Sequence, residues 1–211
     1  IGGWQYDHVK DRLLKGITFL AARYTSQGVS LPVGFHLVAK TQKYVDPKTQ
    51  KEKRRSPVSK NDICRELIKQ AVTNRLPFRF VLFDVWFASA ETMVFIKQKQ
   101  HRDFICPLKT NRKVALSKSD KQQGRYVRVA TLELEAQATR EVYLEGVDFP
   151  LVLVKQVFTN EDGSIGIRYL VSSDTTLSFD DVTTTYHKRW GVECYHKSLK
   201  QNVSLAKSPT Q

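Results

Sequence analysis

Five residues have the side chains and the spacing that chemistry requires. Asp84 follows the apolar run of residues 80–83, at the C-terminal end of a predicted strand, and this is the edge at which sites gather in open α/β sheets. Further along, a predicted helix presents polar side chains within an arc of about 60°, at 100° per residue. These side chains are Tyr186, Arg189, Glu193 and Lys200. Such a face is not an apolar packing stripe.

Each of these features also has an ordinary structural interpretation. An aspartate after a strand is commonly a helix N-cap or a turn former. The polar helix face is equally explained as a solvated surface with an ion pair between Arg189 and Glu193, which have i,i+4 spacing. Position and periodicity by themselves leave both interpretations open.

Taken together, the motifs resemble a known family. The pattern Tyr186-x2-Arg189-x3-Glu193-x6-Lys200 is similar to the YREK signature of bacterial DDE transposases of the insertion-sequence-four group. The segment FDVWFASAE around Asp84 resembles that group's stretch with the second catalytic aspartate, and VSLPVGFHLV resembles part of its first hairpin. The likeness covers essentially the whole chain, and the combination is more specific than either part.

The resemblance implies a fold and a set of roles. It implies an α/β fold, a ribonuclease H-like mixed sheet flanked by helices, with a β-rich insertion before the last catalytic helix. By the same likeness, Asp84 and Glu193 are catalytic and bind metal, while Tyr186, Arg189 and Lys200 contact DNA phosphates near the transposon end. The expected reaction is hydrolysis at the end of the element, followed by attack of the freed 3′-hydroxyl on DNA.

The implied chemistry requires a divalent metal and DNA. Two Mg²⁺ ions about 4 Å apart, held by carboxylates, neutralise charge on the attacking and leaving oxygens, and arginine grips a phosphate bidentately. Mn²⁺ is the expected substitute. The implied partners are transposon-end and target DNA and a second copy in a synaptic homodimer. We expect no nucleotide cofactor, because the sequence has no P-loop or GxGxxG pattern.

The sequence departs from the family at the first of its three catalytic carboxylates. In the family this aspartate stands in an Asp-Asp-Thr context on the strand before the hairpin, and no such context occurs here. Asp7 and Asp11 precede the hairpin, but the likeness places them in the loop after the missing aspartate. We therefore expect a truncated chain that binds metal poorly and cuts little or no DNA. The alternatives are a catalytically inactive DNA-binding transposase remnant and a ribonuclease H-like nuclease.

The charge balance favours a polyanionic partner. Lys and Arg number 34 against 21 Asp and Glu, a net charge of +13, and the pI is about 9.7. Nucleic acid is the commonest partner of such a basic domain, and a merely soluble basic protein is the alternative. No apolar run approaches the roughly 18 residues of a membrane span. Three widely spaced cysteines are typical of reduced thiols inside a cell. Together with this, the resemblance implies a cytoplasmic bacterial protein, nucleoid-associated when bound to DNA.

The elements that position these residues alternate between strand and helix. Residues 15–24 and 29–39 predict a hairpin, and residues 41–60 predict a solvated loop whose basic run could touch phosphate. The pattern then predicts a helix capped by Asn61 or Asp62 and ended by Pro77, and a central strand at residues 80–83 buried on both faces.

The rest of the chain predicts two further regions. A helix capped by Ser89 and a strand at residues 104–108 come first, followed by an antiparallel β region and then one long helix over residues 179–203. We therefore divide the chain into a first core part, a β-rich insertion and the core segment with the glutamate helix. Their bounds are residues 1–111, 112–173 and 174–211.

Overall fold

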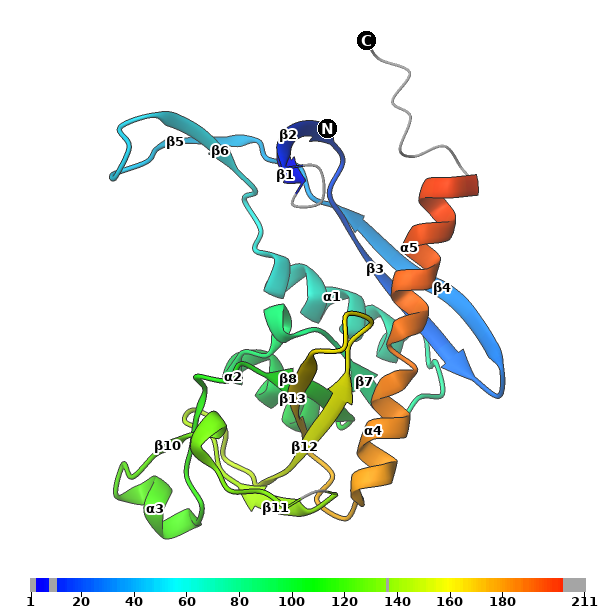
Figure 1. The fold of residues 1–211 in the computed structure, drawn as a ribbon. Coiled ribbons are helices and arrows are strands. Elements are labelled where there is room, and N and C mark those ends of the chain that lie inside the picture. The colour runs from blue at the N-terminus through cyan, green and yellow to red at the C-terminus, as the bar shows by residue number, and fades with distance from the viewer. Residues whose placement is uncertain (1–2, 8–10, 136, 203–211) are drawn as a thin grey trace. The chain divides into compact units, whose positions relative to one another are not determined.

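The computed structural model describes residues 3–7, 11–135 and 137–202 (Figure 1). The chain divides into two compact units, Ile1–Leu76 together with Gly191–Gln211, and Pro77–Trp190. Among the described residues, no helix is long and apolar enough to cross a membrane.

The described part of the first unit contains three antiparallel hairpins. They are β1 (Gly3–Asp7) with β2 (Arg12–Gly16), β3 (Phe19–Ser26) with β4 (Val29–Leu37), and β5 (Gln42–Val45) with β6 (Glu52–Arg55). Gln27 and Gly28 both have positive φ, as the two-residue turn between β3 and β4 requires. The predicted hairpin is thereby confirmed.

The basic segment of residues 41–60, predicted as a loop, contains the β5–β6 hairpin instead. The reason lies in its turn: the Asp46 carboxylate accepts from the Lys48 backbone N–H at 2.9 Å and pairs with the Lys53 ammonium. The Lys53 hydrogen bond lowers the pKa of Asp46 to about 2. An aspartate that binds backbone two residues on is a turn former, and this local chemistry outweighs the low β-propensity of the lysines around it.

Two helices complete the first unit. Helix α1 (Lys60–Thr73) contacts β3 and β4. Its N-cap is Ser59, whose hydroxyl accepts from the Asp62 N–H at 3.1 Å. The predicted caps, Asn61 and Asp62, were therefore wrong. The helix ends at Thr73, before Pro77. Helix α5 (Trp190–Asn202) lies against β3, where the His196 ring meets Phe19 edge-on at 5.1 Å between ring centroids.

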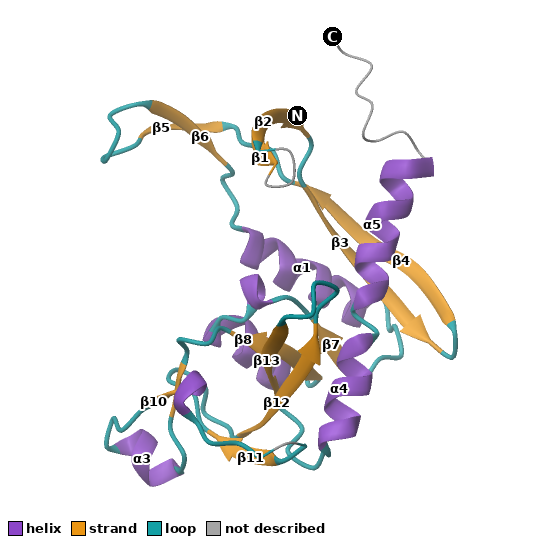
Figure 2. Cartoon of the chain, viewed as in Figure 1, coloured by secondary structure: helices purple, strands orange, loops and turns teal. Residues whose placement is uncertain are grey.

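The second unit is organised by a five-stranded mixed sheet with the order β11-β12-β13-β8-β7. Strand β7 (Phe80–Leu82) is parallel to β8 (Asp103–Leu108), and the remaining neighbours, β13 (Ile165–Ser172), β12 (Leu151–Thr159) and β11 (Thr139–Val142), are antiparallel. Figure 2 shows these strands among the helices of the unit. The predicted fold class, a mixed sheet flanked by helices as in a ribonuclease H-like fold, is confirmed.

The core of this unit forms where α4 (Phe179–His187) packs on the sheet. Val182 and Tyr186 of α4 join Ile105, Val154 and Leu170 in one buried cluster. The cluster explains why β12 and β13 are apolar on both faces at their shared inner end. Helix α2 (Ala90–Val94) begins at the predicted cap, Ser89, and continues into the π-helical turn Phe95–Lys99, which contacts β8.

Three predictions for this unit were wrong. Strand β7 lies at the edge of the described sheet, paired with β8, so the apolar run does not mark a central strand. The predicted long helix is two helices, α4 and α5, interrupted at Lys188 and Arg189. The region of residues 112–173 also includes a helix, α3 (Lys118–Gln122), because Ser117 caps it through the Asp120 N–H at 3.0 Å.

Short elements complete the second unit. They are the 3-10 helices Val85–Phe87 and Val129–Thr131 and the paired strands β9 (Lys113–Val114) and β10 (Val127–Arg128). Strands β12 and β13, which fall in the predicted insertion, share a sheet with β7 and β8. The division at residues 111 and 173 stays a prediction.

Candidate functional site

Asp84 stands where the parallel strands of the sheet end. It follows β7, and Lys109 follows β8. Because β7 and β8 are parallel, their carboxyl ends meet at the same edge of the sheet, where ligands bind in open α/β folds. Asp84 also caps the 3-10 helix Val85–Phe87, with its carboxylate accepting from the Trp86 N–H at 3.4 Å. Asp84 therefore caps this 3-10 helix and also lines a pocket.

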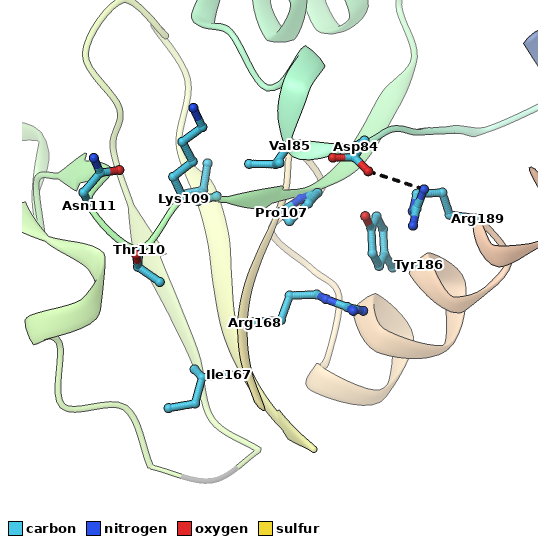
Figure 3. A pocket seen from close by; sticks show the side chains of 11 residues that line it. Asp84, Val85, Pro107, Lys109, Thr110, Asn111, Ile167, Arg168, Tyr186 and Arg189 are labelled. Carbon is cyan, nitrogen blue, oxygen red and sulfur yellow. Dashed lines mark ion pairs between the residues drawn. The ribbon is translucent and has the colours of Figure 1, made fainter. Parts of the chain in front are cut away.

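The pocket at this edge has a volume of about 600 Å³ and is drawn in Figure 3. Its walls come from the ends of β7 and β8, from the middle of β13, and from the C-terminal end of α4 with the turn that follows. Its polar lining residues are Asp84, Lys109, Thr110, Asn111, Arg168, Tyr186 and Arg189. All of these belong to the second unit, so one rigid sheet and one helix position them.

Arg189 reaches the pocket because α4 tightens as it ends. The N–H of Lys188 donates to Thr185 O at 3.2 Å and that of Arg189 to Tyr186 O at 3.0 Å. These are i→i−3 bonds, and in such a turn the side chains at i and i+3 eclipse each other. The Arg189 guanidinium accordingly lies over the Tyr186 ring, with Cζ 5.6 Å from the ring centroid. Its Nη1 lies 3.7 Å from Asp84 Oδ2, an ion pair.

Tyr186 forms the floor below this guanidinium. The residue is 4% exposed and belongs to the core cluster, and its hydroxyl donates to Phe83 O at 3.4 Å. Burial raises the pKa of the phenol to about 12, so the hydroxyl is a proton donor throughout the neutral range. Tyr186 therefore presents its ring rather than its hydroxyl to the arginines.

Arg168 reaches the same ring from β13. Its Cζ lies 5.8 Å from the Tyr186 centroid and 5.1 Å from the Phe158 centroid. Phe158 can take this position because its cross-strand partner is Gly166. A Cβ on Gly166 would lie 2.4 Å from Phe158 Cε2, a clash that any other residue would produce.

The charge in the pocket is dominated by cations. Asp84 is the one carboxylate among the lining residues, and Lys109, Arg168 and Arg189 are the cations, so three positive charges against one negative leave +2. The Asp84 side chain is 40% exposed and that of Arg189 19% exposed. Lys109 and Arg168 are exposed. Two guanidinium groups and an ammonium along one pocket suit a phosphate, which accepts hydrogen bonds from several sides.

The same composition bears on the metal that the resemblance implies. Mg²⁺ prefers oxygen ligands and is usually bound through one or two carboxylates together with substrate phosphates. The pocket offers Asp84 alone, already paired with Arg189. Across the part of the chain that the structure describes, no group of three or more His, Cys, Asp or Glu side chains could hold a metal ion. The pocket residues by themselves do not fit a two-metal site.

The structure thus brings together three of the five predicted site residues, Asp84, Tyr186 and Arg189. Glu193 and Lys200 lie on α5, beyond the break in the helix, in residues of the other unit. The single helical wheel on which the prediction placed all four signature residues was wrong, because α4 ends at His187. The roles predicted for Glu193 and Lys200 stay predictions.

Lys109 and Arg168 were missed by the sequence analysis. Lys109 had a usable signal, since it follows an apolar strand just as Asp84 does. Arg168 had none, because a basic residue between Ile167 and Tyr169 in an alternating strand is expected to face solvent without further meaning.

Comparison with known proteins gives the family. No curated protein matches the chain. The sequence model of a family described as DDE superfamily endonuclease matches residues 1–139, a segment that contains β7, Asp84, β8 and Lys109 and ends at the first residue of β11. A match over well more than half of the sequence shows that the chain belongs to the DDE superfamily endonuclease family, in agreement with its mixed α/β fold.

Proposed function

We propose that the chain is the catalytic region of a DNA transposase of the insertion-sequence-four group, which cuts DNA at the ends of its element and joins them to a target. The observation that supports this best is the pocket, where Asp84 stands at the ends of two parallel strands among Lys109, Arg168 and Arg189. A carboxylate among three cations favours a phosphodiester substrate, because the cations would stabilise the charge on the phosphate oxygens.

In this proposal the pocket residues have distinct tasks. Arg189 and Arg168 hold one DNA phosphate over the Tyr186 ring, and Lys109 adds a point charge at the rim. Tyr186 acts as a positioning residue for both guanidinium groups, because its own hydroxyl is turned to Phe83 O. Lys200, on α5, is assigned to a neighbouring phosphate, as the family signature implies.

Asp84 and Glu193 are proposed as the carboxylates that bind Mg²⁺, with Mn²⁺ as a substitute. Asp84 lies in the pocket of the second unit, and Glu193 lies on α5 in the first. When bound, the ions would neutralise charge at the scissile phosphate. Without them, the chain's own residues hold the phosphate and keep a carboxylate beside it.

The family likeness also indicates how the protein works with partners. We infer that it acts as a synaptic homodimer on two element ends, in the bacterial cytoplasm at the nucleoid. We also propose that cleavage needs a first aspartate upstream of the β3–β4 hairpin, since neither Asp7 nor Asp11 stands in an Asp-Asp-Thr context.

Nicking and binding of labelled duplexes test the proposal. The duplexes carry the DNA flanking the gene or a scrambled sequence, and the chain is compared with a form extended upstream of Ile1. We expect Mg²⁺-dependent nicking of the flanking duplex by the extended form and little or none by the chain. Asp84→Asn and Glu193→Gln should each abolish nicking, while duplex binding by Glu193→Gln stays near the parent value.

Asp84→Asn adds a sharper control. The substitution removes the negative charge 3.7 Å from Arg189, so duplex affinity should stay equal or rise while nicking is lost. Binding without nicking in either form would favour the inactive DNA-binding remnant. Cleavage of the RNA strand of an RNA–DNA hybrid in preference to duplex DNA would favour the ribonuclease H-like nuclease. Nicking that survives Asp84→Asn would refute the assignment of the site.

A further inference from the structure

The β5–β6 hairpin, Gln42–Val45 with Glu52–Arg55 and the turn between them, is a strongly basic segment outside the pocket. Residues 42–55 contain six basic residues against two acidic ones, a net charge of +4. Two ion pairs, Lys43 with Glu52 and Lys53 with Asp46, use both carboxylates. Within the hairpin, all of which the structure describes, the cations without a carboxylate partner are Lys48, Lys51, Arg54 and Arg55.

Burial of apolar side chains does not stabilise the β5–β6 hairpin. None of its residues is buried, and only Tyr44 and Asp46 are half-buried. A two-stranded hairpin without a covered face is at best marginally stable in water. What holds this one together is the Asp46 turn and the contact of Arg55 with the Tyr44 ring, whose centroid lies 5.4 Å from the guanidinium carbon.

The register of the hairpin places two like charges opposite each other. Lys43 stands directly opposite Arg54 on the same face of the ribbon, and like charges opposite each other across a pair of strands are destabilising. Glu52 lies diagonally across and neutralises Lys43, with Nζ 3.1 Å from the carboxylate. Arg54 keeps its charge beside that pair. An exposed ribbon with this repulsion built into it is stabilised by an external polyanion.

We propose that the β5–β6 hairpin is a second DNA-binding element, an arm whose basic side chains follow the phosphates along a groove of duplex DNA. The inference rests on the proposed function insofar as DNA is the substrate. A two-stranded ribbon has the width that the major groove of B-DNA admits. Figure 1 shows the hairpin as a two-stranded ribbon. Its contacts are sequence-independent, because lysines around a turn meet phosphates rather than base edges.

Salt-dependent duplex binding tests the arm. The variant combines Lys48→Gln, Lys51→Gln and Arg54→Gln. A matched control combines Lys69→Gln, Lys99→Gln and Lys118→Gln, which are exposed residues outside the hairpin. Both lower the net charge from +13 to +10. Affinity for a labelled 30-base-pair duplex is measured by fluorescence anisotropy from about 50 to 200 mM salt.

We expect the arm variant to lower the slope of log K against log salt by about 2.7, at about 0.9 for each lost phosphate contact. The salt-induced loss of affinity over that range should then shrink about 40-fold, while the control changes far less. Arg54→Lys keeps the charge and should keep the slope. Circular dichroism and melting should show an intact fold, since Arg54→Gln relieves the repulsion with Lys43.

Other results overturn the proposal. Equal slopes for the arm variant and the control would show that net charge alone attracts DNA. A loss confined to single-stranded RNA, with duplex affinity retained, would assign the arm to RNA. Failure of the proposed function is read separately, from the absence of Mg²⁺-dependent nicking by the extended form. A parent chain that does not bind duplex DNA would overturn the arm as well.

Discussion

Replacing Tyr186 with phenylalanine separates the two roles that this residue could have. The family signature assigns it to a DNA phosphate, whereas the structure turns its hydroxyl to Phe83 O at 3.4 Å in a residue that is 4% exposed. A hydrogen bond contributes about 0.5–1.5 kcal/mol, and this one is long for an O–H donor. We therefore expect Tyr186→Phe to lower the free energy of unfolding by about 0.5 kcal/mol.

A loss of that size lowers the melting temperature by about 1–2 °C in a chain of this length, which differential scanning calorimetry resolves. Tyr186→Ala should cost about 3–5 kcal/mol, because it also removes a buried ring. Duplex affinity should stay within twofold for Tyr186→Phe, since the ring below Arg168 and Arg189 remains. A Tyr186→Phe protein with unchanged melting and a loss of duplex affinity above fivefold would refute this reasoning and restore the hydroxyl as a phosphate contact.

The titration of the phenol gives a second, independent measurement. The folded-state pKa of about 12 lies above the ordinary tyrosine value of 10.0. The folded protein therefore binds more protons than the unfolded chain between these values, and the stability that this contributes is lost as pH rises from about 10 to 12. The fall in stability over this window, followed by urea denaturation, should be smaller in Tyr186→Phe than in the parent. An identical fall in both proteins would show that another group than Tyr186 causes the loss of stability at alkaline pH.

Three further substitutions probe the supports of the site. Ser178→Ala breaks the capping box at the start of α4 and should cost about 1 kcal/mol in urea denaturation; no change would mean that the cap does not position the helix. Arg189→Ala should weaken duplex binding and lower the slope of log K against log salt by about 1. An unchanged slope would show that Arg189 does not contact a phosphate. Gly166→Ala forces the Phe158 ring aside and should cost about 1–3 kcal/mol; a melting temperature equal to the parent's would show that the ring moves freely.

Elements with a local cause were predictable from the sequence. The β3–β4 turn contains a glycine with positive φ at Gly28, and Ser89 caps α2 through the Thr92 N–H at 3.2 Å. Both depend on residues within four positions of each other. The same reasoning failed for residues 41–60, where a single aspartate, Asp46, organises a hairpin among residues with little β-propensity.

The candidate site was predictable only where it followed the strands. Asp84 stands after an apolar run and lies, as predicted, beyond the C-terminal end of a strand, although that strand is the outermost of the sheet and not a central one. The helical wheel failed because it assumed 100° per residue through a turn that tightens at Lys188 and Arg189. Arg168 comes from a strand about 80 positions beyond Asp84, and no local pattern announces a contact made by the pairing of distant strands.

Arg189, proposed to bind phosphate, lies in the break between α4 and α5, whereas Glu193, proposed to bind metal, lies on α5. A continuous helix would place Arg189 at 300° from Tyr186, whereas the i→i−3 turn eclipses the two and sets the guanidinium over the ring. The turn thereby places Arg189 in the pocket of the second unit with Asp84. The other proposed metal ligand, Glu193, follows the turn on α5. Phosphate binding should therefore survive loss of Glu193 and depend on Arg189, while metal binding should depend on both carboxylates.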